Sequence, residues 1–260
     1  MLRVGTWNVQ YARSVDKNVR RRAVLDTHDA DIWVLTETHD DLDLTSTHPH
    51  VVRTAWRYAG NAAAFWTTVW SRLPVIEPIP TVDRSRTVAA RFALDGGGDV
   101  IVYGTVLPWN TDKGPHGQGS GWSEFHRVTP EQGREWLALR AANPESMLVV
   151  AGDLNQSLGG PHYYGTIKGR ALLRETLAAA DLACVTEFGR FPADDLTYPP
   201  IDHVCVAPPA GRRIEHHVRG WNKVVDGVTL SDHSGVVAEL VLDPERAHDS
   251  AKADTKPPAP

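Results

Sequence analysis

The residues best suited to chemistry lie in MLVVAGDLNQS, residues 147–157, where an apolar run leads directly into Asp153 and Asn155. The run MLVV is typical of a buried β-strand, and Gly152 allows the backbone to approach another group closely where that strand ends. In an extended chain, side chains two residues apart face the same side, so Asp153 and Asn155 would project together. The simpler alternative is an Asx turn, in which both side chains only hydrogen-bond the local backbone.

Four other apolar runs also adjoin polar side chains suited to metal or phosphate chemistry. They are TWN at Asn8, LTET at Glu37, IDHV at Asp202, and LSDHSG at Asp232 and His233. Each motif is weak alone, because Asp, Asn and Ser commonly form caps and turns. Five such motifs in one chain favour a shared site over turn chemistry.

This residue set matches the needs of phosphate ester hydrolysis. A phosphate ester is anionic and repels a nucleophile, so its hydrolysis needs a cation, a base that activates water, and donors that hold the phosphoryl oxygens. Mg²⁺ prefers hard oxygen ligands and keeps several waters, so one or two carboxylates with an amide oxygen suffice. Glu37 is the first choice of ligand; its structural alternative is a salt bridge to an arginine.

The composition is that of an ordinary soluble globular protein, with 260 residues, 42% apolar and 23% charged. The sequence has no internal linker or repeat, which predicts one domain over residues 1–242. Residues 243–260 form a polar, proline-rich tail, which we expect to be disordered. The amino terminus lacks the apolar stretch of a signal peptide, and no run reaches the roughly 20 apolar residues of a membrane helix. We therefore expect a cytoplasmic monomer without a transmembrane segment.

The apolar spacing predicts a mixed α/β fold. Helices are expected at Val15–His28, at Thr129–Ala142 with Thr129 as the cap and Pro130 in the first turn, and from about Lys168 to Ala180. Residues 108–126 are Gly-rich and polar, a loop of the kind that often carries function. Many strand-like segments occur in both halves of the chain, which predicts two packed sheets with helices outside.

The two cysteines, Cys184 and Cys205, each lie in an apolar run. This placement predicts buried free thiols rather than a disulfide.

Seven segments together resemble the motifs of the endonuclease/exonuclease/phosphatase superfamily, in order and in position relative to strands, over residues 3–240: RVGTWNVQ, DIWVLTETH, TTVWSRLPV, VYGTVLPWN, VVAGDLNQS, PPIDHVCV and LSDHSGVVAEL. The resemblance implies a DNase-like four-layer α/β sandwich, with two mixed β-sheets packed face to face and flanked by helices. It also implies hydrolysis of a phosphate ester with a divalent cation, usually Mg²⁺, with Mn²⁺ as the alternative. The cation's ligands would be Glu37, Asp232, and Asn8 through its side-chain carbonyl.

The same resemblance implies catalytic roles. Asp153 would orient or deprotonate the attacking water, and Asn155 would donate to a non-bridging phosphoryl oxygen. His233 would hold the phosphate, with Asp202 fixing its second ring nitrogen. His203 should point to the opposite side of its strand, and we interpret it as structural.

The sequence departs from the family pattern in GTVL, where Val106 occupies the place of a His or Tyr that assists the leaving group. Valine cannot donate a proton, so this role falls to a metal-bound water or to a loop residue, Asn110, His116 or His162. For the two histidines the alternative is an ordinary solvated residue, which we favour for His116. Trp109 and Asn110 form a predicted cleft wall for a base or a lipid group.

The leading functional prediction is a metal-dependent phosphodiesterase, such as a nuclease, acting on nucleic acid or a related ester. One alternative is a phosphatase for a small phosphorylated metabolite or lipid head group. Another is a catalytically silent phosphate-binding relative, favoured by Val106 but opposed by the otherwise intact acids. The net charge of −5 argues against a nucleic-acid coat protein and weakens the nuclease version, since affinity for polyanions comes largely from Lys and Arg.

Overall fold

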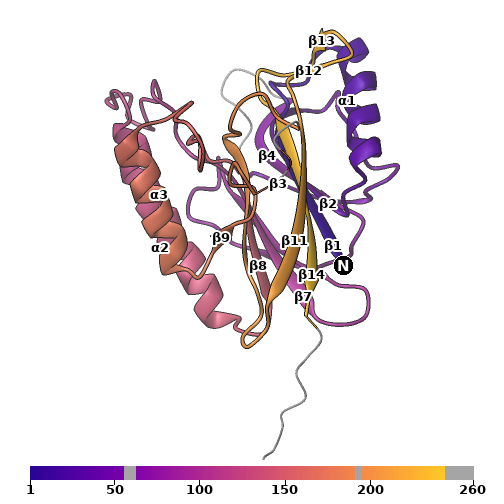
Figure 1. Ribbon diagram of the computed structural model, residues 1–260, viewed down its shortest axis with the longest axis vertical. Coiled ribbons are helices and arrows are strands. Elements are labelled where there is room, and N and C mark those ends of the chain that lie inside the picture. Colours follow the sequence, from indigo (N-terminus) through magenta and orange to yellow (C-terminus); the bar gives the residue numbers. More distant parts are fainter. Residues whose placement is uncertain (56–62, 191, 193–194, 244–260) are drawn as a thin grey trace, which may run out of the picture.

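The structure is a computed structural model that describes residues 1–55, 63–190, 192 and 195–243. Two β-sheets pack face to face in the middle, and helices cover both outer faces (Figure 1). Helix α1 (Val15–His28) covers one sheet, while α2 (Ser123–Ala142) and α3 (Ile167–Ala179) cover the other. The predicted four-layer α/β sandwich is confirmed. Within the described ranges, no helix has the length and apolar character needed to cross a membrane.

The first sheet contains six strands in the order β11 (Ile214–Trp221), β14 (Gly235–Leu242), β1 (Leu2–Asn8), β2 (Ile32–His39), β4 (Ala64–Ser71) and β3 (His50–Arg53). The pair β1 and β2 is parallel, and the other pairs are antiparallel. A parallel pair needs a crossover connection, which α1 provides. The carboxyl ends of β1 and β2 therefore meet at one edge of this sheet.

The second sheet contains six strands in the order β5 (Val75–Ile79), β6 (Val88–Ala93), β7 (Asp99–Val106), β8 (Met147–Asp153), β10 (Asp202–Ala207) and β9 (Ala183–Cys184). Here β7 and β8 form the parallel pair, with α2 as the crossover. A separate small hairpin consists of β12 (Val224–Val225) and β13 (Val228–Thr229).

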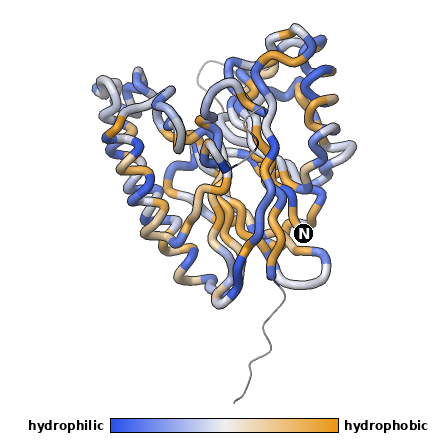
Figure 2. The backbone as a smooth tube through the Cα atoms, viewed as in Figure 1, coloured by the Kyte–Doolittle hydropathy of each residue, from blue (hydrophilic) through white to orange (hydrophobic). Residues whose placement is uncertain are grey.

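The space between the sheets is filled by branched apolar side chains, many of them valine. Val4, Val34 and Val69 come from the first sheet, and Val102 and Val149 come from the second. Apolar residues are concentrated in this central region (Figure 2). Because the central strands are covered on both faces, their sequences are nearly continuous apolar runs.

A tryptophan cluster fills the space between the first sheet and α1. Trp7 and Trp221 meet edge to face with ring centroids 5.4 Å apart. The indole of Trp33 covers Gly5 on the neighbouring strand, so closely that a Cβ at position 5 would lie 2.1 Å from the ring. The cluster is buried, and Trp7 comes directly before Asn8 at the end of β1.

Helix α2 differs from the prediction, because it begins at Ser123 rather than near Thr129. Phe125 and Val128 are buried against the second sheet and continue the helical spacing that leads to Trp136. Their burial outweighs the loss of one backbone hydrogen bond at Pro130, which lies inside the helix. Thr129 is therefore a buried helical residue instead of a cap, and the preceding loop ends at Trp122.

Strand β11 was not expected from the sequence. Its residues, IEHHVRGW, include only two buried side chains, Val218 and Trp221, because it is an edge strand with a largely exposed face. One of the strand-like segments of the first half, VVRTAWRYA at residues 51–59, lies partly outside the described residues, as does the tail beyond residue 243. Cys184 and Cys205 are free and buried, which confirms the predicted thiols.

Gly152 provides the close backbone approach expected at the end of β8. It has φ +136°, and a Cβ there would lie 1.9 Å from the carbonyl oxygen of Thr105 on β7. We predict that Gly152→Ala lowers the free energy of unfolding by about 1–3 kcal/mol, because β7 and β8 must separate beside Asp153.

Urea unfolding measures this effect, with Gly97→Ala as the matched control. Gly97 also has a positive φ, +101°, but a Cβ added there would have no other atom within 4 Å, so the control isolates backbone strain from collision. Equal losses of stability in the two variants would contradict the close-approach explanation.

Candidate active site

The polar residues that end separate strands converge at one edge of the two sheets. Asn8 and Glu37 lie at the carboxyl ends of the parallel strands β1 and β2. Asp153 ends β8 and is the direct cross-strand partner of Asp202, which begins β10. His233 lies just before β14, the neighbour of β1. The two sheets thus contribute to one cluster of side chains.

Asn8 connects two carboxylates from different sheets. Its Nδ2 donates to Glu37 Oε1 at 3.1 Å and to Asp153 Oδ2 at 3.2 Å. Its Oδ1 accepts from the backbone N–H of Gln10 at 2.9 Å, which fixes the orientation of the amide. The side-chain carbonyl expected to face a cation is therefore held by the backbone, and the amide nitrogen faces the carboxylates.

His233 is paired with Asp202, and Nδ1 lies 2.6 Å from Asp202 Oδ2. Its Nε2 lies 3.9 Å from Asp153 Oδ2. Burial by itself lowers the pKa of His233, but attraction by Asp202 and Asp153, with the Asp202 hydrogen bond, raises it to about 10 overall. The ring is therefore an imidazolium at neutral pH and can donate through both nitrogens.

The backbone of His233 is clamped by two residues of the first sheet region. Trp7 donates through Nε1 to the His233 carbonyl oxygen at 3.1 Å. Ser231 Oγ accepts from the His233 N–H at 3.1 Å and donates to the Asn8 carbonyl oxygen at 2.6 Å. These bonds tie the position of the imidazole to the tryptophan cluster and to the end of β1.

Asp153 uses its two carboxylate oxygens differently. Oδ1 accepts from the backbone N–H of Asn155 at 3.0 Å, which is the Asx turn considered as the simpler alternative. Oδ2 faces Asn8 and His233. Burial raises the pKa of Asp153 to about 7, Asp202 and Glu37 add to the rise, and His233 and Asn8 oppose it. Its Oδ2 therefore combines high basicity with contact to the polar cluster.

Asn155 lies beyond the end of β8, so strand alternation does not orient it as expected. Its backbone has φ 52°, and its Nδ2 donates to the Leu107 carbonyl oxygen at 2.8 Å. The turn, instead of an extended chain, places the amide beside the end of β7. One Nδ2 hydrogen remains for another acceptor, because an amide nitrogen carries two.

The cluster carries excess negative charge that suits a divalent cation. Burial chiefly raises the pKa of Glu37, and the nearby carboxylates of Asp232 and Asp202 raise it further, against Asn8 and His233. Glu37 also has φ 51° within β2, an unusual conformation for a residue with a side chain. Asp202 Oδ1 is buried without a hydrogen-bond partner in the described part of the chain. Hard carboxylate oxygens in this number fit Mg²⁺ or Mn²⁺.

A second grouping, Asp153, Asp202 and His233, also brings three ligand atoms within 4.8 Å of one another. It fits a cation less well, because His233 Nδ1 already forms the short bond to Asp202 and the ring is charged. A cation needs neutral imidazole as its ligand. The side of the cluster at Glu37, rich in oxygen, is the better candidate.

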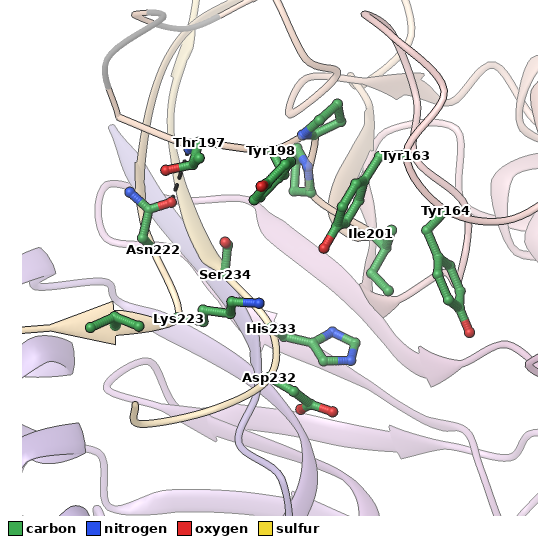
Figure 3. Close-up of a pocket in the computed structure, with 13 residues that line it drawn as sticks. Tyr163, Tyr164, Thr197, Tyr198, Ile201, Asn222, Lys223, Asp232, His233 and Ser234 are labelled. Carbon is green, nitrogen blue, oxygen red and sulfur yellow. Dashed lines mark hydrogen bonds between the residues drawn. The ribbon is translucent and has the colours of Figure 1, made fainter. Parts of the chain in front are cut away.

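A cavity of about 590 Å³ opens beside His233 and Asp232 (Figure 3). Tyr163, Tyr198 and Lys223 contribute to its lining, and sequence reasoning did not single them out. The only available signal was their proximity in sequence to motifs: HYYG follows DLNQS, TYPP precedes IDHV, and WNK lies shortly before LSDHSG.

Tyr164 also lines this cavity and supplies a hydroxyl near the carboxylates. Burial chiefly raises the pKa of Tyr164, with contributions from Asp153 and Asp232, so its phenol stays protonated at neutral pH. Its ring meets Trp122 edge to face, with centroids 5.5 Å apart. Val106, by contrast, is a buried apolar side chain.

The three predicted substrate contacts do not line the cavity at His233. Trp109 packs against Trp66 with ring centroids 5.4 Å apart, and the guanidinium of Arg86 lies 5.6 Å from its ring. Asn110 and His162 are exposed. Their contact with a substrate stays a prediction.

His203 lies on the opposite side of β10 from Asp202, as its strand position predicts. It is fully buried, with Nε2 bonded to the Gln156 carbonyl oxygen at 3.0 Å and Nδ1 3.2 Å from Thr186 Oγ1. These bonds satisfy both ring nitrogens, which agrees with a structural role.

Two packed mixed sheets with acids, amides and a histidine gathered at one edge define a DNase-like fold with an acid-rich site. The chain belongs to the Endonuclease/Exonuclease/phosphatase family, whose model matches residues 5–233.

Solved structures with the same fold agree with this assignment. An endonuclease/exonuclease/phosphatase from Beutenbergia cavernae is 22% identical with a TM-score of 0.61, covering 93% of this chain and 71% of that one. The human nocturnin catalytic domain with a bound sulfate anion is 13% identical with a TM-score of 0.64, covering 93% of each chain. A Staphylococcus aureus beta toxin mutant with bound magnesium ions is 14% identical with a TM-score of 0.58, covering 91% of this chain and 98% of that one. No curated protein sequence matches the chain.

The Asp202–His233 pair predicts a measurable change in protonation. In Asp202→Asn, the imidazolium loses the carboxylate whose attraction most raises its pKa, so the pKa of His233 should fall. Nuclear magnetic resonance titration of the His233 ring in metal-free protein measures this shift, with His217→Gln, on the exposed face of β11, as the control. An unchanged pKa in Asp202→Asn would show that Asp202 does not hold the charge on the ring.

Proposed function

We propose that the protein is a divalent-metal-dependent phosphoesterase whose preferred substrates are phosphodiesters. The observation that carries this proposal is the linked set of Glu37, Asn8 and Asp153 beside the His233–Asp202 pair. Family membership supports it, because members of this family are typically hydrolases of phosphate esters. The magnesium ions in the beta toxin structure support the choice of cation.

Glu37 and Asp232 would hold the cation, and Asn8 would orient the carboxylate of Glu37 through its Nδ2 instead of acting as the predicted ligand. When bound, the cation would neutralise phosphate charge and polarise the phosphoryl group. It would also offset the mutual repulsion of the carboxylates that now raises the pKa of Glu37.

The remaining residues provide proton transfer and phosphate binding. Asp153 would accept a proton from the attacking water while the water oxygen forms a bond to phosphorus. His233 presents Nε2 on the same side as Asp153 and can donate to a phosphoryl oxygen as negative charge builds up. The free Nδ2 hydrogen of Asn155 offers a second donor.

The leaving oxygen needs a proton that Val106 cannot supply. Tyr164 brings a protonated hydroxyl to the cavity beside His233 and Asp232 and interacts with Asp153 and Asp232, so we assign it this role in place of the loop residues named from the sequence. The bond from phosphorus to the leaving oxygen would break as that oxygen takes the phenolic proton.

Hydrolysis of two phosphodiesters tests these roles, one with a 4-nitrophenyl leaving group and one with an alkyl leaving group. EDTA should abolish both activities and added Mg²⁺ should restore them. Asp153→Asn and His233→Gln should each lose at least ~100-fold on both esters, because each removes a group needed in every turnover. Tyr164→Phe should lose about 100-fold on the alkyl ester only, since 4-nitrophenolate leaves without a proton.

The exposed control variant His217→Gln should keep full activity on both esters, and circular dichroism should show that all variants are folded. Full activity in EDTA, or in both Asp153→Asn and His233→Gln, would reject the proposed chemistry. Equal losses on the two esters in Tyr164→Phe would reject only the assignment of the leaving-group donor.

A further inference from the structure

We propose that the cavity beside His233 binds the planar ring of a nucleoside, with Tyr163 and Tyr198 as its stacking surface and Lys223 as the contact for an anionic group. This inference rests on the proposed function and narrows its substrate class. Preferred substrates would be small nucleotide esters or single-stranded ends, in which a base is free to leave its own stack.

The two tyrosines form an exposed aromatic surface. Their rings are nearly parallel, with centroids 4.8 Å apart and 17° between planes. Tyr163 is 46% exposed and Tyr198 is 50% exposed, which is high for large aromatic side chains. In Figure 3 both rings lie at the wall of the cavity that His233 also lines. Because the two rings stack on each other, a flat ligand ring can extend the stack on an outer face of the pair, whatever its hydrogen-bonding edge.

Both tyrosines are held in place by their backbones. The N–H of Tyr163 donates to the buried Ser157 Oγ at 3.3 Å. Next to Tyr198, the N–H of Thr197 donates to Asn222 Oδ1 at 2.9 Å, and Pro199 and Pro200 restrict the chain that follows. The aromatic surface therefore exists before a ligand arrives, which reduces the entropy lost on binding.

Lys223 gives the cavity a contact for an anionic group. Lys223 extends its amino group into the cavity beside His233 (Figure 3) and forms no ion pair with any described residue. Asp232 lines the same cavity, so Lys223 marks the part of it that an anionic group would occupy.

The size and depth of the cavity also limit the ligand. Its volume of about 590 Å³ lies within the range of roughly 300–1,000 Å³ typical of small-molecule sites. A base in a duplex is paired and stacked, and it must be flipped out at a free-energy cost before it can enter such a cavity. An ester without a planar aromatic ring, such as an inositol phosphate, would leave the tyrosines without a stacking partner.

The proposal is tested with two probes, one with a planar base and one without it: adenosine monophosphate and ribose 5-phosphate. Calorimetry on the full chain without metal should show that the wild type binds adenosine monophosphate at least ~10-fold more tightly than ribose 5-phosphate. Tyr163→Ala and Tyr198→Ala should each weaken binding of adenosine monophosphate by about 5- to 100-fold and leave ribose 5-phosphate unchanged. Tyr198→Phe, the matched control, should retain wild-type binding, and Lys223→Gln should weaken both probes.

Equal affinity for the two probes, binding of neither at millimolar concentration, or retained affinity in both alanine variants would overturn this proposal. Because binding is measured without metal or turnover, the result is independent of hydrolysis. A chain that binds adenosine monophosphate through the tyrosines but hydrolyses no ester would contradict the proposed function alone. A chain that hydrolyses esters with and without a planar base equally well would contradict this inference alone.

Discussion

The structure depends on the crowding of buried carboxylates around one imidazolium. Glu37, Asp153 and Asp202 come from three different strands, and only His233 among the described residues offsets their charge directly. Burial is the largest cause of the raised pKa of Glu37 and of Asp153, and repulsion among these carboxylates in a low-dielectric environment adds to it. This arrangement has an excess of negative charge, which a divalent cation and a protonated histidine can neutralise together.

The scaffold withstands this repulsion because each charged residue is fixed by the strands that carry it. The parallel pairs in the two sheets bring strand ends to one edge, and the valine core locks the sheets face to face. Trp7 connects this packing to the site, since its indole lies in the tryptophan cluster and its Nε1 bonds the His233 carbonyl. Dense packing thus holds like charges close together despite their repulsion.

Much of the fold and the central part of the site were predictable from sequence, because both depend on local patterns. A β-branched run that ends on an acid marks a strand end, and parallel connections bring such ends together. The pairing of Asp202 with His233 matches the family pattern and is present in the structure. Helix α2 and strand β11 differed from the prediction, because the burial of Phe125 and the edge position of β11 depend on tertiary packing.

The direction of side chains after a strand end was less predictable. Asn155 turns away from the extended course because Asp153 forms an Asx turn, and Asn8 presents nitrogen because Gln10 holds its oxygen. The paired tyrosines come from loops far apart in sequence, so no spacing rule relates Tyr163 to Tyr198. Such features depend on which loops come into contact in the folded protein, and local sequence patterns do not show this.

The most direct measurement of the central claim is calorimetric titration of the folded protein with Mn²⁺ in place of Mg²⁺. The wild type should bind the cation, Glu37→Gln should lose at least ~10-fold in affinity, and Asp26→Asn, on the exposed face of α1, should bind like the wild type. Equal affinity in the wild type and Glu37→Gln would contradict the claim that this carboxylate cluster is organised around a cation.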